Sequence, residues 1–321
     1  MIGIMSNALK GHEGRAPAST LDAAKAAGFG GVMFGSLLEA SPDLSPVALQ
    51  QLAADARARD MTVACGISSF NPSNPARNAK LTALGDGDIV KGFAKAIDGA
   101  AALGTGSLFF VVGAIEDRED PALPWAEQLA KVTEALIGLR SRAKDQGVGL
   151  WLKTHEELTT FEIVRIIEAV GADVMGVSHD PVNLVCRIED PVLATQRIAP
   201  YVKQVHLDDA IVTFDGDTVR RYLADMGRGD LDWPGILNIV GDVPAWVEFH
   251  RGQFAMPVFD AAWVAAQPDL ALDEYRGIVG TAFRRFNKHE APSDQSDPYG
   301  RLPAAIEWLT TTYPQLAGTT R

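Results

Sequence analysis

Short runs of apolar and β-branched residues alternate with longer segments of helical periodicity along most of this chain. The apolar runs predict strands at residues 2–5, 31–35, 62–67, 107–112, 149–153, 174–178, 202–207 and 245–249. Helical periodicity is clearest at 47–60, 125–147 and 159–171, and the last of these opens on a threonine cap and closes on a glycine. This alternation indicates parallel strands joined by crossover helices.

Eight such units predict an α/β fold, a closed (β/α)₈ TIM barrel over residues 1–275, with a C-terminal extension at 276–321. The alternative, an open doubly wound sheet, usually carries a G-x-G-x-x-G turn after its first strand. The segment "MSNALKGHEG" has no such turn. The pattern therefore favours the barrel as a single domain.

Two segments depart from the repeating unit. A long insertion at 208–232 follows the seventh strand and is large enough to cover part of a site. It carries Arg220, Arg221 and Arg228, which we expect to be solvated, with contact to a phosphate or carboxylate as the alternative. The extension ends in an amphipathic segment with Ile306, Leu309 and Leu316, which predicts packing on the barrel or on a partner. A homo-oligomer is expected, or a pairing with a second subunit.

Composition and charge exclude several classes of protein. The chain has 321 residues, of which 47% are hydrophobic and 22% charged, as in a globular protein with a large core. Its formal charge of −12 and the lack of a basic run argue against nucleic acid as a partner. The two cysteines, the absence of a leader and the short apolar runs predict a cytoplasmic protein that neither enters a membrane nor depends on disulfides.

Ionisable side chains gather at the carboxyl ends of the predicted strands, which form the mouth of a TIM barrel. They are His155, His179, His206 and His250, together with Lys153, Glu156, Asp180, Asp208, Asp209 and Glu248. A single one would most often be solvated or hydrogen-bonded, but their concentration on the last four strands favours a site. Carboxylates and imidazoles in this number can surround a divalent cation.

At these residues the chain resembles the xylose isomerase-like barrel superfamily, also called the sugar phosphate isomerase/epimerase family, over roughly residues 1–275. The resemblance rests on "SHDPVNL", "VHLDD", "WVEFH" and "MGRGDLDWPGIL", which match the family's D-P-x-N, H-x-x-D, final Glu and G-x-G-x-x-D-W patterns in order. It implies Asp180, His206 and Glu248 as ligands of a divalent metal ion (Mn, Mg, Co or Zn). Asn183, His179, His250 and Arg228 are the candidate substrate-binding residues.

The family's E-N-H at the end of the fifth strand aligns with "KTH", so Lys153 stands where the first metal-ligating Glu is expected. Four alternatives stay open. In the first, the metal is kept on Asp180, His206 and Glu248, and Lys153 acts as base or electrostatic clamp. In the second, the ammonium replaces the metal, and in the third, Lys153 forms a Schiff base with a carbonyl substrate. In the fourth, the chain is a non-catalytic relative. A shifted alignment would instead make Glu156 or Glu157 the ligand.

The resemblance implies a carbohydrate substrate and proton abstraction next to its carbonyl, with a cation on the developing oxyanion. Loss of one of two family glutamates favours one-base chemistry: isomerisation, or β-elimination by a dehydratase or a C-glycoside-cleaving lyase. His155 or Lys153 is the expected base, and Glu248 the expected ligand and second acid/base. Two rivals from other classes are a DNA-repair endonuclease, disfavoured by the charge, and a non-catalytic binding subunit.

Overall fold

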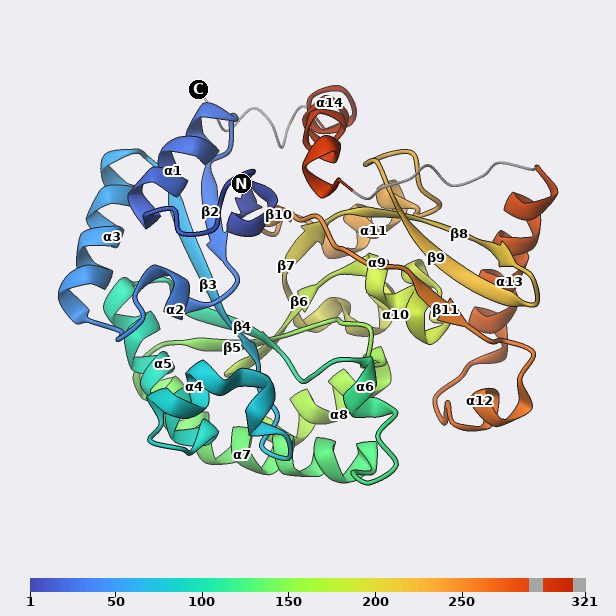
Figure 1. The fold of residues 1–321 in the computed structure, drawn as a ribbon, viewed down its shortest axis with the longest axis horizontal. Coiled ribbons are helices and arrows are strands. Elements are labelled where there is room, and N and C mark those ends of the chain that lie inside the picture. Colours follow the sequence, from blue (N-terminus) through green and yellow to red (C-terminus); the bar gives the residue numbers. More distant parts are fainter. Residues whose placement is uncertain (289–296, 314–321) are drawn as a thin grey trace.

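The computed structural model describes residues 1–288 and 297–313, and its centre is a closed barrel of eight parallel strands (Figure 1). The barrel strands are β1 (Ile2–Met5), β2 (Gly31–Phe34), β3 (Thr62–Ser69), β4 (Ser107–Val111), β5 (Gly149–Lys153), β6 (Met175–His179), β7 (Val202–Leu207) and β10 (Ala245–Val247). They pair in chain order, and β10 closes the ring against β1 and β7. The predicted TIM barrel and all eight of its predicted strands are confirmed.

Helices surround the barrel and connect its strands (Figure 1). They are α1 (Pro17–Ala26), α2 (Leu37–Ala40), α3 (Pro46–Ala58), α4 (Ala79–Leu84), α5 (Ile89–Leu103), α6 (Ile115–Arg118), α7 (Trp125–Asp145), α8 (Thr160–Val170), α9 (Pro181–Leu184), α10 (Pro191–Ile198) and α11 (Trp233–Val240). The predicted cap of α8 is present: the Thr159 hydroxyl accepts a hydrogen bond from the Glu162 amide, and Glu162 accepts one from the Thr159 amide.

The barrel interior is filled by large side chains, and one close approach requires a glycine. Trp246 on β10 is almost fully buried, and its ring passes Gly3 on the neighbouring strand β1. A Cβ atom on Gly3 would lie 2.3 Å from the indole, so no larger residue fits there. The lower barrel is therefore a packed core, and chemistry is left to the mouth.

The insertion after β7 forms a second small sheet rather than a loop. Strands β8 (Asp209–Asp215) and β9 (Thr218–Ala224) make an antiparallel hairpin, and β11 (Phe254–Met256) adds a third strand. Together with α12 (Ala261–Ala265) and α13 (Leu272–Asn287), this sheet forms a lobe beside the barrel, on the right of Figure 1. The lobe has its own cluster of buried apolar residues, including Val212, Val219 and Ile278.

The C-terminal extension returns to the barrel. The expected boundary between 275 and 276 falls inside α13, which packs on β8. Residues 289–296 and 314–321, including Leu316, lie outside the described residues. Between them, a short 3-10 helix (Pro298–Arg301) leads into α14 (Leu302–Thr312). Leu309 of α14 is buried in the barrel's apolar cluster, and the ring centres of Trp308 and Trp233 lie 6.1 Å apart.

Within the described part of the chain, we find no helix with the length and apolar character needed to cross a membrane. Cys65 and Cys186 are both buried free thiols.

Candidate active site

Four neighbouring barrel strands deliver ionisable side chains to the mouth. Lys153 ends β5, Asp180 follows β6, His206 lies in β7 and Glu248 follows β10. Asp180, His206 and Glu248 each offer a ligand atom, and these atoms lie within 4.8 Å of one another. The predicted metal-ligand set therefore comes together as a candidate metal site, and all three side chains are buried.

The Lys153 ammonium lies between the two carboxylates of this candidate site. Its Nζ is 2.9 Å from Asp180 Oδ2 and 2.7 Å from Glu248 Oε2, and only 4% of the residue is exposed. Burial by itself lowers the pKa of Lys153, but Asp180 and Glu248 outweigh it and hold the pKa above its ordinary value. An ammonium has three N–H donors, so one remains for a bound oxygen once these two carboxylates are satisfied.

The residues, as they lie, do not fit a divalent ion beside a protonated Lys153. An ion at about 2.0–2.2 Å from Asp180 Oδ2 or Glu248 Oε2 would lie within about 5 Å of the ammonium. At an effective dielectric constant of about 20, repulsion between the two cations alone amounts to about 7 kcal/mol. The two carboxylates therefore serve either the ammonium or a metal ion, and Lys153 lies in hydrogen-bonding contact with both.

A row of hydrogen bonds sets the orientation of His206. The Trp246 indole donates to Gln204 Oε1 (3.2 Å), and Gln204 Nε2 donates to Ser178 Oγ (2.7 Å). The Ser178 hydroxyl then donates to His206 Nε2 (2.7 Å), which leaves the imidazole proton on Nδ1, 2.6 Å from Glu248 Oε2. Burial lowers the pKa of His206, in keeping with a neutral ring. In this state Nδ1 carries its proton close to the Glu248 carboxylate and offers no lone pair to a metal.

His250, expected to bind substrate, lies at the edge of the same cluster. Its Nε2 is 2.8 Å from Asp180 Oδ2 and 3.6 Å from Glu248 Oε1, while Nδ1 is 3.0 Å from Asp208 Oδ2. Burial lowers its pKa, but Asp180 and Glu248 more than compensate and raise it to about 9. With Lys153 and His250 both cationic, the charges of Asp180 and Glu248 are balanced.

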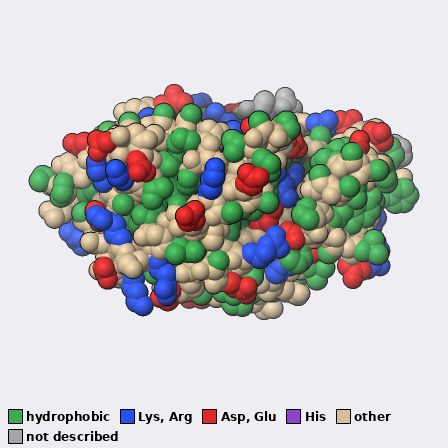
Figure 2. Space-filling model, turned by 90° about the horizontal axis from the view of Figure 1, so that it is seen from below, with side chains coloured by type: hydrophobic (Ala, Val, Ile, Leu, Met, Phe, Trp, Pro, Cys, Tyr) green, Lys and Arg blue, Asp and Glu red, His purple; other side chains and the backbone are tan. Residues whose placement is uncertain are grey.

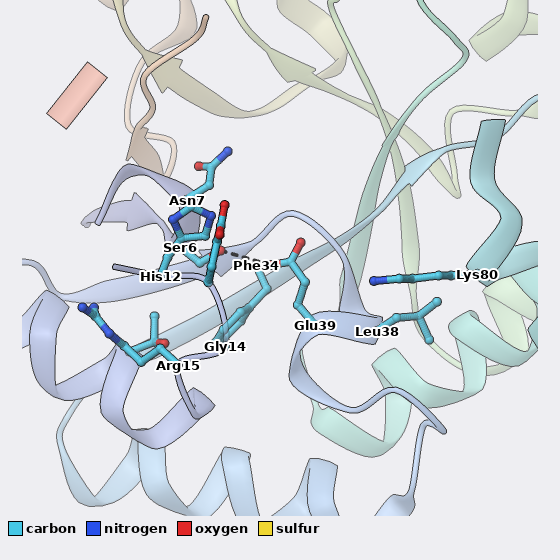
Figure 3. A pocket seen from close by; sticks show the side chains of 11 residues that line it. Ser6, Asn7, His12, Gly14, Arg15, Phe34, Leu38, Glu39 and Lys80 are labelled. Carbon is cyan, nitrogen blue, oxygen red and sulfur yellow. Dashed lines mark hydrogen bonds between the residues drawn. The ribbon is translucent and has the colours of Figure 1, made fainter. Parts of the chain in front are cut away.

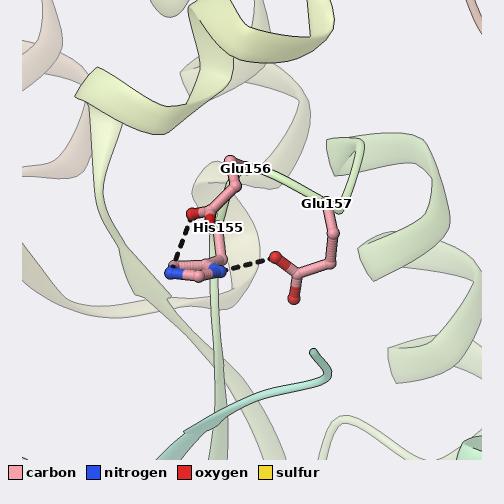
Figure 4. A group of neighbouring side chains, drawn as sticks. All are labelled: His155, Glu156 and Glu157. Carbon is pink, nitrogen blue, oxygen red and sulfur yellow. Dashed lines mark hydrogen bonds and ion pairs between the residues drawn. The ribbon is translucent and has the colours of Figure 1, made fainter. Parts of the chain in front are cut away.

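His155 is held between two carboxylates in the loop that follows β5 (Figure 4). Nδ1 lies 2.5 Å from Glu157 Oε2, and Nε2 lies 2.8 Å from Glu156 Oε2. The three side chains are close enough to hold a metal ion. Burial lowers the pKa of His155, but Glu157 and Glu156 overcome it and raise it to about 10. Both ring nitrogens therefore carry protons, and the residue expected to be a base is placed to donate one.

Asn183 is fixed by a residue whose role the sequence did not suggest. Its amide nitrogen lies 3.1 Å from Asp180 Oδ2, and its oxygen accepts a hydrogen bond from Arg221 Nη1 at 3.2 Å. Arg221 is fully buried and stacks 4.7 Å from the Phe254 ring. The expectation that all three arginines of the insertion are solvated is therefore wrong for Arg221. Its alternation with Arg220 on β9 was the signal that could have identified it.

The structure does not bring His179 and Arg228 to this cluster. His179 is fully buried and its Nε2 lies 2.8 Å from Thr195 Oγ1 on α10, because alternate residues of β6 face the barrel and the helices. Burial lowers the pKa of His179 to about 3. The Arg228 side chain is 73% exposed and pairs with Asp225 at 3.7 Å.

Asp209 explains the G-x-G pattern that follows the hairpin. Its Oδ2 accepts hydrogen bonds from the Gly227 and Gly229 amides, at 2.9 and 3.0 Å. A Cβ atom on Gly229 would lie 2.0 Å from the Asp209 carboxylate, so the turn can form only around a glycine. Asp209 thus ties the end of the hairpin to β7, three residues after His206.

A pocket of about 530 Å³ adjoins the mouth beside β1 and β2 (Figure 3). Its lining comes mainly from the loops after these two strands and includes Ser6, His12, Glu39 and Lys80. Glu39 accepts a hydrogen bond from Ser6 Oγ at 3.3 Å, and burial raises its pKa. Our sequence reasoning did not single out these residues, although the positions of Ser6 and Glu39 after β1 and β2 mark them as mouth residues.

Comparison with known proteins places the chain among relatives of one fold. A family model described as "Xylose isomerase-like TIM barrel" matches residues 21–249. This match confirms the resemblance drawn from the strand-end motifs. The uncharacterized protein YihM of Escherichia coli (strain K12) is 23% identical over 110 residues. That match spans about a third of each protein, 34% of this chain and 34% of YihM.

Solved structures share the fold over nearly the whole chain. D-psicose 3-epimerase from Clostridium cellulolyticum H10, determined with D-tagatose, superposes with a TM-score of 0.62 at 14% identity, covering 87% of this chain and 99% of that one. The IolI protein with a bound zinc atom gives a TM-score of 0.59 at 14% identity, covering 90% and 99%. At such identities the likeness establishes a common architecture.

Proposed function

We propose that this chain, which belongs to the xylose isomerase-like TIM barrel family, is an isomerase-type enzyme. In this proposal it acts by proton transfer next to the carbonyl of a keto-sugar. One observation carries the proposal: the Lys153 ammonium bridges Asp180 and Glu248, the carboxylates of the candidate metal site. In this proposal the ammonium supplies the positive charge that stabilises the enediolate oxygen.

Glu248 and Lys153 then each have one role in the reaction. Glu248 Oε1, which lies 3.6 Å from His250 Nε2, accepts the proton from the carbon next to the carbonyl. The remaining N–H of Lys153 binds the carbonyl oxygen as it becomes an oxyanion. Return of the proton to the neighbouring carbon, with a proton shift between the two oxygens, gives the isomeric sugar. Only one carboxylate is placed as base, which favours isomerisation over two-base epimerisation.

The position of His155 supports a second candidate, β-elimination from the keto-sugar. Its side chain is 20% exposed and carries a proton between Glu156 and Glu157. An imidazolium at the mouth can protonate a leaving hydroxyl while Glu248 takes the proton next to the carbonyl. The products distinguish the two reactions, since elimination removes one water and isomerisation leaves the mass unchanged.

The adjoining pocket supports a polyhydroxylated substrate. The pocket has a volume of about 530 Å³, and Ser6, Glu39 and Lys80 in its lining offer hydrogen-bond donors and acceptors. A volume of this size suits a monosaccharide or its phosphate ester. Whether the sugar is phosphorylated is decided by the assay below.

The test is solvent-deuterium exchange into a panel of free and phosphorylated ketohexoses and ketopentoses, followed by mass spectrometry. The wild type should add one deuterium to at least one ketose. Lys153→Gln, which keeps a hydrogen-bond donor but removes the charge, and Glu248→Gln should each lower exchange by about 10²–10⁴-fold. Lys144→Gln is the matched control, because Lys144 is an exposed lysine paired with Asp173.

Two results would overturn the proposal. Exchange by Lys153→Gln at the wild-type rate would remove the ammonium from the mechanism. A folded wild type that exchanges no ketose of the panel, with or without added Mn²⁺ or Zn²⁺, would point to a non-catalytic binding protein. Thermal melting of each variant separates loss of chemistry from loss of fold.

A further inference from the structure

The C-terminal extension brings a buried cation to the barrel mouth. Arg301 is 1% exposed, and its Nη1 donates to Asp208 Oδ1 at 2.8 Å. Its Nη2 donates to the backbone oxygen of His250 at 2.6 Å. The guanidinium also stacks with its carbon 5.0 Å from the centre of the Phe249 ring. One side chain therefore contacts the segment that follows β10 at two points and joins it to Asp208, which follows β7.

Asp208 links Arg301 to the His250 ring, because its two oxygens contact the two residues separately. Its second oxygen, Oδ2, accepts a hydrogen bond from the His250 amide at 2.9 Å and lies 3.0 Å from Nδ1. Because both Asp208 oxygens already accept hydrogen bonds, from the Arg301 guanidinium and the His250 amide, we assign Nδ1 as the donor in its contact with Oδ2. With the ring fixed in this way, Nε2 lies 2.8 Å from Asp180 Oδ2.

We propose that Arg301 is a positioning residue of the active site, acting through Asp208 to fix the orientation of His250 against Asp180. This inference rests on the proposed function for its catalytic consequence, but not for its structural one. It makes the C-terminal extension part of the active site, because the described barrel residues place no other side-chain cation in hydrogen-bonding contact with Asp208 Oδ1.

A second contact of the same segment supports this role. The Tyr299 hydroxyl lies 3.3 Å from Arg251 Nη2 and 3.3 Å from His12 Nδ1. His12 lines the pocket beside β1, so the Pro298–Arg301 turn contacts both the pocket and the His250 side of the mouth.

The first experiment compares the kinetics of Arg301→Ala and Arg301→Lys with those of Leu309→Ala. Leu309 is buried on the helix that follows Arg301, so its truncation loosens the extension but keeps the contact between Arg301 and Asp208. In the deuterium-exchange assay, Arg301→Ala should lower kcat by about 10–100-fold with little change in KM, because a misdirected group acts on the chemical step. Added guanidinium should restore part of this loss, and Leu309→Ala should keep kcat.

The second experiment does not depend on activity. Nitrogen-15 NMR of histidine-labelled protein, with the His250 signals identified by a His250→Gln variant, reports the hydrogen-bonded proton on Nδ1. That signal should shift or vanish in Arg301→Ala and persist in Leu309→Ala. If Arg301→Ala does not fold, Arg301→Lys is read in the same way, because a lysine cannot reach both Asp208 and the His250 carbonyl.

The outcomes separate the two proposals. A changed His250 signal in a protein that exchanges no ketose would sustain the positioning role and reject the proposed reaction. An unchanged His250 signal in Arg301→Ala would overturn the positioning role whatever the activity. A fall in kcat shared equally by Arg301→Ala and Leu309→Ala would also overturn it, since the extension would then act only through stability.

Discussion

Replacement of Lys153 by glutamate would change the charge at the centre of the mouth by two units. The introduced carboxylate would join those of Asp180 and Glu248 beside His206, and this is a good donor set for a divalent ion. We expect purified wild type to carry no stoichiometric metal, because its ammonium neutralises the two carboxylates. Lys153→Glu should bind about one divalent ion per chain. Elemental mass spectrometry of both proteins, after dialysis against Mn²⁺ or Zn²⁺, measures this directly.

The control is Lys144→Glu, which changes the charge by the same amount on an exposed surface. Wild-type protein that retains one ion per chain would show that Asp180, His206 and Glu248 bind metal in spite of the lysine. In that case Lys153 has lost its proton or turned away, and the ammonium mechanism fails. Equal metal content in Lys144→Glu and Lys153→Glu would mean that the binding is non-specific.

The clamp around His155 predicts a pH-dependent contribution to stability. Burial opposes the charged ring, but Glu157 and Glu156 raise its pKa to about 10 from an ordinary value of 6.5. Since the folded state binds this proton more tightly, the contribution is complete below pH 6.5 and is lost as the pH rises through 10. Urea unfolding should therefore show a gap between wild type and His155→Gln of a few kcal/mol at most, which shrinks between pH 6.5 and 10. A gap that stays constant over this range would contradict the clamp.

The location of a single site residue was predictable where its position in a strand decided whether it reaches the barrel mouth. Lys153, Asp180 and His206 lie at or near strand ends, so the barrel alone brought them to the mouth. Their states were not predictable, because protonation depends on neighbours that the sequence does not identify. The expected base, His155, holds its proton because of Glu157, only two residues away, whose carboxylate the loop turns toward the ring.

At the scale of elements, two helix glycines differ in what surrounds them. Gly138 lies exposed on α7 with no atom within 4 Å of a built Cβ, whereas a Cβ on Gly92 of α5 would lie 1.9 Å from the Leu81 carbonyl oxygen. Gly138→Ala should raise the free energy of unfolding by about 0.5–1 kcal/mol through helix propensity alone. Gly92→Ala should lower it by about 2 kcal/mol or more, because α4 and α5 must separate.

Urea denaturation of the two variants provides its own matched comparison, since the substitution is the same. Destabilisation by Gly138→Ala would mean that α7 is not the regular exposed helix described above. A neutral Gly92→Ala would mean that the close contact between α4 and α5 relaxes without loss.

The hairpin after β7 carried a sequence signal that we read only as an insertion. Residues 209–215 and 218–224 flank the two-residue turn Gly216–Asp217, and apolar positions alternate on both sides of it. Such a turn between alternating runs is a strong hairpin indicator. The third strand was harder to predict from the sequence, because β11 has only three residues and joins β9 from a distant part of the chain.

At the scale of the whole molecule, the repeating unit predicted the barrel, and long-range contacts escaped prediction. The pairing of Arg301 with Asp208 joins residues 93 positions apart. Arg301 lies beyond residues 289–296, which the structure does not describe, so its sequence position gave no indication of the contact. Local periodicity specifies elements and their order, whereas packing of the extension depends on which surface the finished barrel offers.

The lobe formed by the sheet β8–β9–β11 with α12 and α13 exposes aromatic side chains that the barrel does not cover. Phe214 stacks on Phe259 with ring centres 5.9 Å apart and meets Phe286 edge-on at 6.4 Å. Phe259, Phe283 and Phe286 are 63%, 57% and 53% exposed. Figure 2 shows hydrophobic side chains gathered over this lobe, on the right of the view. Clustered exposed aromatic rings are a common feature of protein interfaces.

The homo-oligomer expected from the sequence stays a prediction, and this lobe gives it a specific form. If copies of the chain associate through these rings, Phe283→Asp combined with Phe286→Asp should shift the protein to monomer in sedimentation velocity, because burying two carboxylates without partners is unfavourable. Ile137→Asp, which changes an exposed apolar residue on α7, is the control and should leave the assembly intact. A wild type that sediments as a single chain at all concentrations would contradict the expectation. An oligomer that survives the double substitution would move the interface to another surface.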